Sequence, residues 1–232
     1  LWARLDCTSG LPGVGDWKPG FFTPTMKQEI WCTIMETFHG AEDALPDYRP
    51  NPDSRDRNPE LWDEYPVQCL TGRRIPVYFH SEHRQLPWCR EVWPVPRVEI
   101  NPEDAAEWGI EQGDWVWIES PHGKIRETAD LYYGIPRGVI NCEHTWWYPE
   151  MPAPEHGWRY SAVNQLVNND IDDPHCGSAI VRGYPVKVYK ATADNSPFGN
   201  PCPCTEDGTE IIHDASDARL KDWAPVYEGR DQ

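Results

Sequence analysis

Residues 97–120 have the sequence RVEINPEDAAEWGIEQGDWVWIES, in which a short apolar strand, a capped helix, a glycine turn and a second strand follow one another. Asn101 is a favourable helix N-cap, and Pro102 suits the first helical position because its missing N–H would have no intrahelical partner there. Acidic residues fill the first turn, and Gly109 is typical of a helix end. We therefore predict two strands that are joined by one short helix.

Further short β patterns flank this stretch. Pro121-His122-Gly123 is a hairpin signal between the strand that ends at Ser120 and a longer strand that follows it. The predicted strands lie at 67–70, 97–100, 115–120, 124–133, 139–143 and 186–190. Short strands with one short helix and Gly/Pro turns favour a mainly β domain, in the form of a compact barrel.

Composition divides the 232 residues into three zones. Residues 1–66 are rich in Pro, Gly and Trp and form a predicted connector, residues 67–191 hold the predicted barrel, and residues 192–232 form a predicted acidic C-terminal tail. From residue 205 to the end there are eight acidic and three basic residues without sustained periodicity. We expect a loosely held tail, with Trp223 and Val226 as docking points.

The connector contains one helical pattern, near residues 25–39. Its apolar residues recur at the spacing of one helix face, which predicts packing against a core: Trp31, Ile34, Met35 and Phe38. Residues 41–64 then carry eight acidic and three basic residues between prolines. This second stretch predicts an extended surface connector.

Charge and cysteine spacing exclude several classes of protein. Lys and Arg number 21 against 38 Asp and Glu, so the formal net charge is −17. A general nucleic-acid or anionic-membrane binder would need positive charge instead. No apolar run approaches the roughly 20 residues of a membrane span. Of the eight cysteines only Cys202 and Cys204 are close together, so the ligand spacing of zinc ribbons and iron–sulfur clusters is missing and no metal site is predicted.

One segment contradicts the overall charge. Residues 71–90 contain four Arg, two His and a single acidic residue, directly after a predicted strand. Hydroxyls from Thr71 and Ser81, backbone N–H groups and guanidinium groups are the donors that a phosphate or pyrophosphate needs. The alternative is a basic loop that pairs with the acidic stretch 41–64.

Two further clusters are candidates for chemistry. Residues 141–150, at another strand end, place His144 beside Glu143 and several aromatic residues, which would suit an acid–base pair or stacking on a planar ring. Residues 164–174 are rich in Asn and Asp, whose side chains could recognise a heterocycle. Core packing and a helix end with an Asp-Pro turn are the respective structural alternatives.

In this order, these segments resemble the C-terminal molybdopterin-dinucleotide-binding domain of the dimethyl-sulfoxide-reductase-type molybdenum and tungsten oxidoreductases. The resemblance runs through most of residues 17–191. It rests on Phe21-Phe22-Thr23-Pro24-Thr25-Met26-Lys27-Gln28-Glu29, with Met26 in place of the family's usual Gly, on Leu70-Thr71-Gly72-Arg73, and on the stretch 98–116. Residues 80–87 and 144–150 look most like the branch of acetylene hydratase, pyrogallol hydroxytransferase and catechol dehydroxylases.

The resemblance implies a six-stranded double-psi β-barrel, like that of the aspartate-decarboxylase superfamily, with short flanking helices. It implies that this barrel binds the guanine-dinucleotide arm of a molybdopterin guanine dinucleotide carrying Mo or W. One departure is Tyr184-Pro185, where many relatives have Tyr-Lys. The contact that this Lys makes with the cofactor in those relatives is therefore not expected here. The implied cofactor-binding residues are Thr71, Gly72, Arg73, Arg74, His80, Ser81, His83, His144, Thr145, Trp147 and Asn164.

The same resemblance implies a part of a larger anaerobic reductase or dehydrogenase, inactive alone, with His144 as a candidate on the substrate side. Upstream domains of the same polypeptide would carry the metal ligand and an iron–sulfur cluster, and an iron–sulfur subunit would transfer electrons to or from a small substrate. The location would be the bacterial cytoplasm or the periplasmic side. Two alternatives are an acidic module that docks another subunit and a free-standing barrel that uses Glu143 and His144 for acid–base chemistry.

Overall fold

The computed structural model describes residues 23–73, 75–175, 177–179, 182–196, 210, 212 and 216–221. Arg74, Trp223 and Val226 lie outside the described residues. The chain divides into two compact units, residues 1–49 and residues 50–232. No helix in the described part of the chain is long and apolar enough to cross a membrane.

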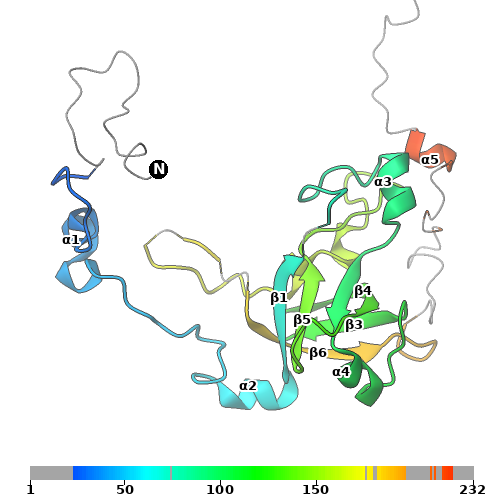
Figure 1. Cartoon of the computed structure of the whole chain (residues 1–232), viewed down its shortest axis with the longest axis horizontal. Helices are drawn as coiled ribbons and strands as arrows, with labels where there is room; N and C mark the ends of the chain where they lie inside the picture. Colours follow the sequence, from blue (N-terminus) through cyan, green and yellow to red (C-terminus); the bar gives the residue numbers. More distant parts are fainter. Residues whose placement is uncertain are drawn as a thin grey trace, which may run out of the picture. The chain divides into compact units, whose positions relative to one another are not determined.

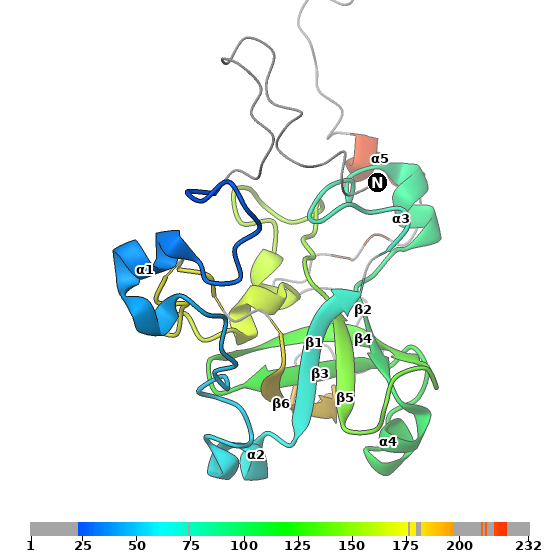
Figure 2. The ribbon, with the colours of Figure 1, turned by 60° about the vertical axis from the view of Figure 1, so that its left-hand side comes forward.

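The second unit contains a closed barrel of six strands in the order β1-β5-β2-β4-β3-β6 (Figure 1). The pairs β1–β5 and β2–β4 are parallel, and the other neighbours are antiparallel. Figure 2 shows β1 and β5 side by side. The predicted six-stranded β-barrel is confirmed. The strands are β1 (Val67–Arg73), β2 (Arg97–Ile100), β3 (Trp115–Ser120), β4 (Gly123–Leu131), β5 (Val139–Glu143) and β6 (Tyr184–Lys190).

The capped helix of the opening stretch forms as α4 (Pro102–Glu107). The Asn101 side chain accepts a hydrogen bond from the Glu103 N–H at 2.9 Å, and its amide donates to the Ile135 carbonyl at 2.8 Å. This one residue therefore caps the helix and ties it to the loop before β5. The other helices of this unit are α2 (Pro59–Glu64), α3 (Pro87–Val92), the short α5 (Ala218–Lys221), and the 3-10 turns η4 (Trp158–Tyr160) and η5 (Val163–Leu166).

Strand β3 supplies two hydrophobic cores at once, because alternate side chains of a strand point to opposite faces. Val116 and Ile118 are buried in the barrel interior. Trp115 and Trp117 belong to a second, largely aromatic cluster with residues of the loops after β1 and β5, such as Tyr78 and Trp146. The Trp-Val-Trp-Ile alternation thus joins the barrel to the loops that carry the candidate site.

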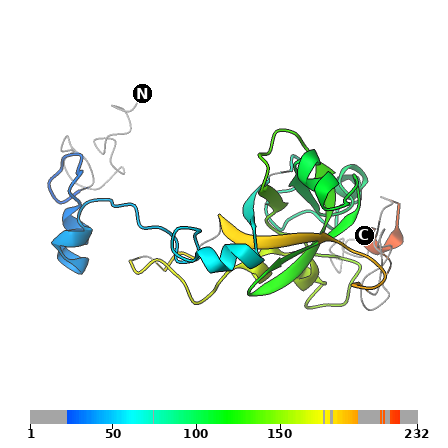
Figure 3. The same cartoon turned by 90° about the horizontal axis from the view of Figure 1, so that it is seen from below.

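The acidic stretch 41–64, which the composition predicts as an extended surface connector, contains two short helical elements. These are the 3-10 turn η3 (Ala41–Asp43) and α2, which lies beside β6 (Figure 3). Pro59 begins α2, and the nearly buried Trp62 donates from its indole to the Asp53 carbonyl at 2.8 Å. The Trp62 indole therefore ties α2 to the loop that precedes it.

In the first unit, the helix predicted near 25–39 forms only as α1 (Thr33–His39). The Glu29 carboxylate accepts hydrogen bonds from the N–H and hydroxyl groups of both Thr25 and Thr33. Glu29 thereby caps the helix at Thr33. No residue of α1 is buried, and Phe38 is 76% exposed. No core packing of the apolar stripe is seen among the described residues, and the expected packing stays a prediction.

The described parts of the acidic tail are held by the barrel unit. Ile212 is 1% exposed, and its carbonyl accepts from buried Arg90 at 2.8 Å, while its N–H donates to Glu150 at 3.1 Å. Leu220 in α5 is also buried. No periodic pattern in the sequence predicts these contacts, so the tail segments near Ile212 and Leu220 are better anchored than expected.

Candidate functional site

The loops after β1 and β5, together with η4 and η5, surround two adjoining cavities. The first, which we call the histidine cavity, has a volume of about 350 Å³ and is lined by Thr71, Gly72, His80, His144, Thr145, Val163, Asn164, Val167 and Arg182. The second, the tryptophan cavity, has a volume of about 430 Å³ and is lined by Ser81, Thr145, Trp146, Trp147, Pro154, Glu155, His156, Trp158, Ala162 and Asn164. Thr145 and Asn164 line both cavities, so the two cavities share part of their walls.

The histidine cavity brings together segments that are far apart in the sequence. His80 and His144 come from different loops, yet their rings make a hydrogen bond of 3.1 Å between His80 Nδ1 and His144 Nε2. The two rings are nearly perpendicular, at a centroid distance of 5.0 Å. None of the described residues that line this cavity is acidic, although the chain carries a net charge of −17. Two imidazoles, a guanidinium and an amide suit an anionic ligand.

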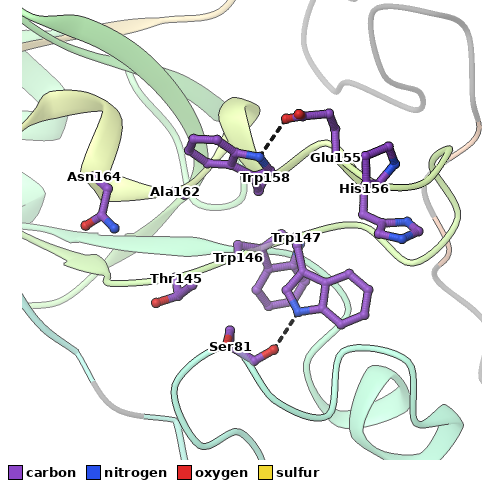
Figure 4. Close-up of a pocket in the computed structure, with 10 residues that line it drawn as sticks. Ser81, Thr145, Trp146, Trp147, Glu155, His156, Trp158, Ala162 and Asn164 are labelled. Atoms are coloured by element: carbon purple, nitrogen blue, oxygen red, sulfur yellow. Dashed lines mark hydrogen bonds between the residues drawn. The ribbon is translucent and has the colours of Figure 1, made fainter.

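The tryptophan cavity offers flat apolar walls. Figure 4 shows the indole of Trp158 on one side and those of Trp146 and Trp147 on the other, with Thr145 and Asn164 at one end. The Trp147 indole donates to the Ser81 carbonyl, and the Trp158 indole donates to Glu155 at 2.7 Å. Rings that are fixed in this way suit a planar, polar-edged heterocycle.

Arg73 does not line either cavity. Its guanidinium pairs with Asp130 and lies 3.8 Å from Glu99 and 5.1 Å from the centre of the Trp93 ring. The hydrogen bonds from Arg73 and Gln112 keep the pKa of the Asp130 carboxyl below its usual value, although burial acts in the opposite direction. Arg73 therefore connects three strands of the barrel.

The other residues of the basic segment have separate positions. The Gly72 N–H donates to the Asn141 side chain at 3.0 Å, so this backbone donor is already used within the protein. His83 is 42% exposed in its side chain and lies 3.8 Å from Glu82, outside both cavity walls. Arg90 pairs with Glu150, whose side chain is as fully buried as its own. The acidic partners of Arg73 and Arg90 thus come from the barrel unit, not from the stretch 41–64.

Glu143 is poorly placed for acid–base chemistry at the cavities. It is 1% exposed, and its carboxyl accepts from the Trp93 indole and from the Arg97 N–H. Burial raises the pKa of Glu143 to about 8. Its neighbour His144 faces the histidine cavity instead. The free-standing acid–base alternative therefore has no support from this geometry.

Several lining residues were missed by sequence reasoning. Arg182 lies just before β6 in a Gly-rich segment, and an isolated Arg gives no signal there. Trp158 and His156 follow a run of Pro and Glu that predicts only a loop. Val163 and Val167 lie beside Asn164 and would have been found by extending that candidate by one turn. A third, polar cavity of about 480 Å³ also reaches Asn164 and is lined by Pro121, His122, Gln165, Val167, Asn168, Asn169 and Asp170.

Comparisons with known proteins show the family to which this chain is similar. Residues 69–183 match the family model described as the molydopterin dinucleotide binding domain. The chain is 62% identical over 233 aligned residues to dopamine dehydroxylase of Eggerthella lenta, covering 100% of this chain and 23% of that protein. It is 30% identical over 178 residues to acetylene hydratase of Syntrophotalea acetylenica, covering 74% of this chain and 24% of that protein.

A solved structure, acetylene hydratase from Pelobacter acetylenicus, superposes with a TM-score of 0.67 at 29% identity. The match covers 74% of this chain and 24% of that one. Residues 69–183, which hold most of the barrel, therefore belong to a cofactor-binding domain, as the sequence resemblance predicted. The chain belongs to the dimethyl-sulfoxide-reductase family and contains its molybdopterin-dinucleotide-binding domain. It spans about a quarter of the length of the relatives named here.

Proposed function

We propose that this chain is the C-terminal part of a longer molybdenum or tungsten enzyme and holds the guanine-dinucleotide arm of its cofactor. The observation that carries the proposal is the histidine cavity, where residues from four separate segments meet without an acidic side chain among the described lining residues. Thr71, His80, His144 and Asn164 were predicted as cofactor-binding residues, and their common location supports that assignment.

The donors of the histidine cavity fit a diphosphate. Arg182 and the His80–His144 pair would meet its charge, and the Thr71 hydroxyl would meet an oxygen. The tryptophan cavity would hold a planar ring, with the Asn164 amide at the junction to recognise its polar edge. When bound, the cofactor would supply a metal that exchanges oxygen atoms or electrons with a small substrate.

For the parent enzyme we propose the reductive removal of a hydroxyl group from a catechol. The supporting observation is the 62% identity with dopamine dehydroxylase along the whole chain. Upstream domains of the same polypeptide would provide the metal ligand and an iron–sulfur cluster, and an iron–sulfur subunit would deliver electrons. To test this, the purified full-length gene product is incubated with a reduced dye and each of a panel of catechols. If no catechol leads to oxidation of the dye, the proposal is contradicted.

The cofactor assignment is tested by Arg182→Gln in the full-length gene product. We expect the content of pterin and of Mo or W to fall about tenfold or more, because a hydrogen bond to a charged group is worth roughly 1.5–3 kcal/mol. The matched control is Arg57→Gln, since Arg57 is exposed and outside the cavity walls. Wild-type protein without pterin and metal, or equal contents in both variants, would contradict the assignment.

A further inference from the structure

Arg84 is a buried cation that connects the two loops of the site. Its side chain is 2% exposed, although the sequence places it in a surface-like basic segment. Nη1 donates to the carbonyls of His80 at 2.5 Å and Glu82 at 2.8 Å, and Nη2 donates to the carbonyl of Thr145 at 2.6 Å. His80 and Thr145 both line the histidine cavity.

The surroundings of Arg84 suit a guanidinium and no other side chain. The Tyr78 ring lies 4.2 Å and the Trp146 ring 5.1 Å from its central carbon, so aromatic faces contact the guanidinium beside the three carbonyls. Burial lowers the pKa of Arg84 to about 10, which still leaves it charged at neutral pH. A lysine ammonium is a compact point charge whose three donors all come from one nitrogen, so it cannot reproduce the planar fork that spans two loops.

The loop that Arg84 holds is conformationally unusual. His80 has a φ of +50° and His83 a φ of +75°, values that side-chain-bearing residues adopt only when their surroundings enforce them. The Arg84 bonds fix the backbone between these positions. The Trp147–Ser81 hydrogen bond makes a second link between the same two loops.

We propose that Arg84 is a positioning residue that keeps the walls of both cavities in register for the dinucleotide, without touching the ligand itself. The inference rests on the proposed function, because the ligand of these walls is taken from it. It departs from the sequence interpretation, in which the arginines of residues 71–90 were anion-binding groups. Arg84 faces carbonyl oxygens of its own protein, and its role is to hold His80, Ser81 and Thr145 in place.

Arg90 provides a matched control. It is also fully buried, and its guanidinium lies 5.6 Å from the same Trp146 ring. Its guanidinium donates to the Glu150 carboxylate, to the Ile212 carbonyl and, at 3.5 Å, to the Arg84 carbonyl, and none of these three residues lines the two cavities. Arg84→Lys and Arg90→Lys therefore both remove a buried guanidinium group, but only the first removes the hydrogen bonds to His80 and Thr145 in the cavity walls.

Hydrogen exchange of the 232-residue chain gives the first readout. For Arg84→Lys and Arg84→Gln we expect amide exchange in residues 79–86 and 144–147 to accelerate about tenfold or more, with the strands of the barrel unchanged. For Arg90→Lys the acceleration should fall instead on the segments around Glu150 and Ile212. If the amides of the two loops exchange as slowly in the Arg84 variants as in the wild type, the inference is overturned, whether or not any cofactor binds.

Cofactor content of the full-length gene product gives the second readout. Among folded molecules separated by gel filtration, we expect the pterin and metal content of Arg84→Lys to fall about fivefold or more, and that of Arg90→Lys to stay near the wild-type level. Equal losses in the two variants would make Arg84 a merely structural residue and overturn the inference. A wild-type protein without pterin and metal would instead contradict the proposed function, and the exchange result would still stand.

Discussion

At the scale of single residues, Glu127 and Glu143 are two carboxyl groups buried inside a barrel of acidic protein. Their exposures are 0% and 1%, and Glu127 Oε2 lies 3.4 Å from the Glu143 N–H. Burial, and for Glu127 the neighbouring Glu143 as well, raises the pKa of each, that of Glu143 from 4.5 to about 8. The native barrel therefore favours the neutral acids.

This raised pKa predicts the direction of the pH dependence of stability. Between about pH 4.5 and pH 8 the unfolded chain releases the Glu143 proton while the native barrel retains it. The contribution of Glu143 to the free energy of unfolding should therefore be fully present below about pH 4.5 and be lost as the pH rises to about 8. The loss should be on the order of a few kcal/mol. Urea unfolding of the 232-residue chain from about pH 5 to about pH 8.5 measures it.

The substitution Glu143→Gln should reduce this loss, because an amide cannot ionise. The exposed Glu60→Gln is the control and should leave the pH profile unchanged. A profile for Glu143→Gln that coincides with that of the wild type would show that ionisation of Glu143 does not cause the pH dependence.

The arginines show what residue counting can and cannot predict. The segment 71–90 was identified as locally basic, and His80 and Ser81 from it do line the cavities. The direction of a side chain, however, depends on partners that are distant in sequence. Arg73 meets Asp130 on β4, and Arg84 meets the Thr145 carbonyl after β5. Neither contact can be found before the strand order is known.

At the scale of elements, prediction succeeded where local chemistry is complete. The strands at 97–100, 115–120 and 139–143 form with the predicted bounds, and α4 has its predicted cap. The helix near 25–39 lost its first half because Glu29 caps Thr33, a side-chain interaction that an apolar period does not contain. Periodicity describes which face a helix would have, but not where its first N–H groups find partners.

The α4 cap makes a quantitative prediction at this scale. Asn101→Ala should lower the free energy of unfolding by about 1–2 kcal/mol, because the Glu103 N–H loses its acceptor and the Ile135 carbonyl loses its donor. Asn101→Ser keeps a capping oxygen and should cost less. Urea unfolding of both variants checks the order; an Ala variant as stable as the wild type would show that the cap is dispensable.

At the scale of the whole molecule, the net charge of −17 does not show how the charges are distributed. The acidic groups are concentrated in particular segments, with eight in residues 41–64 and eight in residues 205–232. The described walls of the histidine cavity contain none. A global charge therefore excludes an extended phosphate surface, but it does not exclude one enclosed dinucleotide, because a ligand in a cavity responds mainly to the groups that line it.

The division into two units predicts a separation of stabilities. In α1, Ile34 is 48% and Phe38 76% exposed, whereas Ile118 of β3 is fully buried in the barrel. The double substitution Ile34→Gln with Phe38→Gln should change the free energy of barrel unfolding by no more than about 0.5 kcal/mol. Ile118→Ala should lower it by about 2–5 kcal/mol, because it removes buried methyl groups and leaves a cavity.

Tryptophan fluorescence during urea unfolding of the 232-residue chain compares these variants, since ten of the 13 tryptophans belong to the barrel unit, among them Trp115 and Trp117 of β3. A loss of barrel stability in the double variant comparable to that of Ile118→Ala would mean that the stripe on α1 contributes to the core after all. The original prediction from its periodicity would then be right in solution. An unchanged transition would show that the barrel unit holds its cavities without help from the apolar stripe.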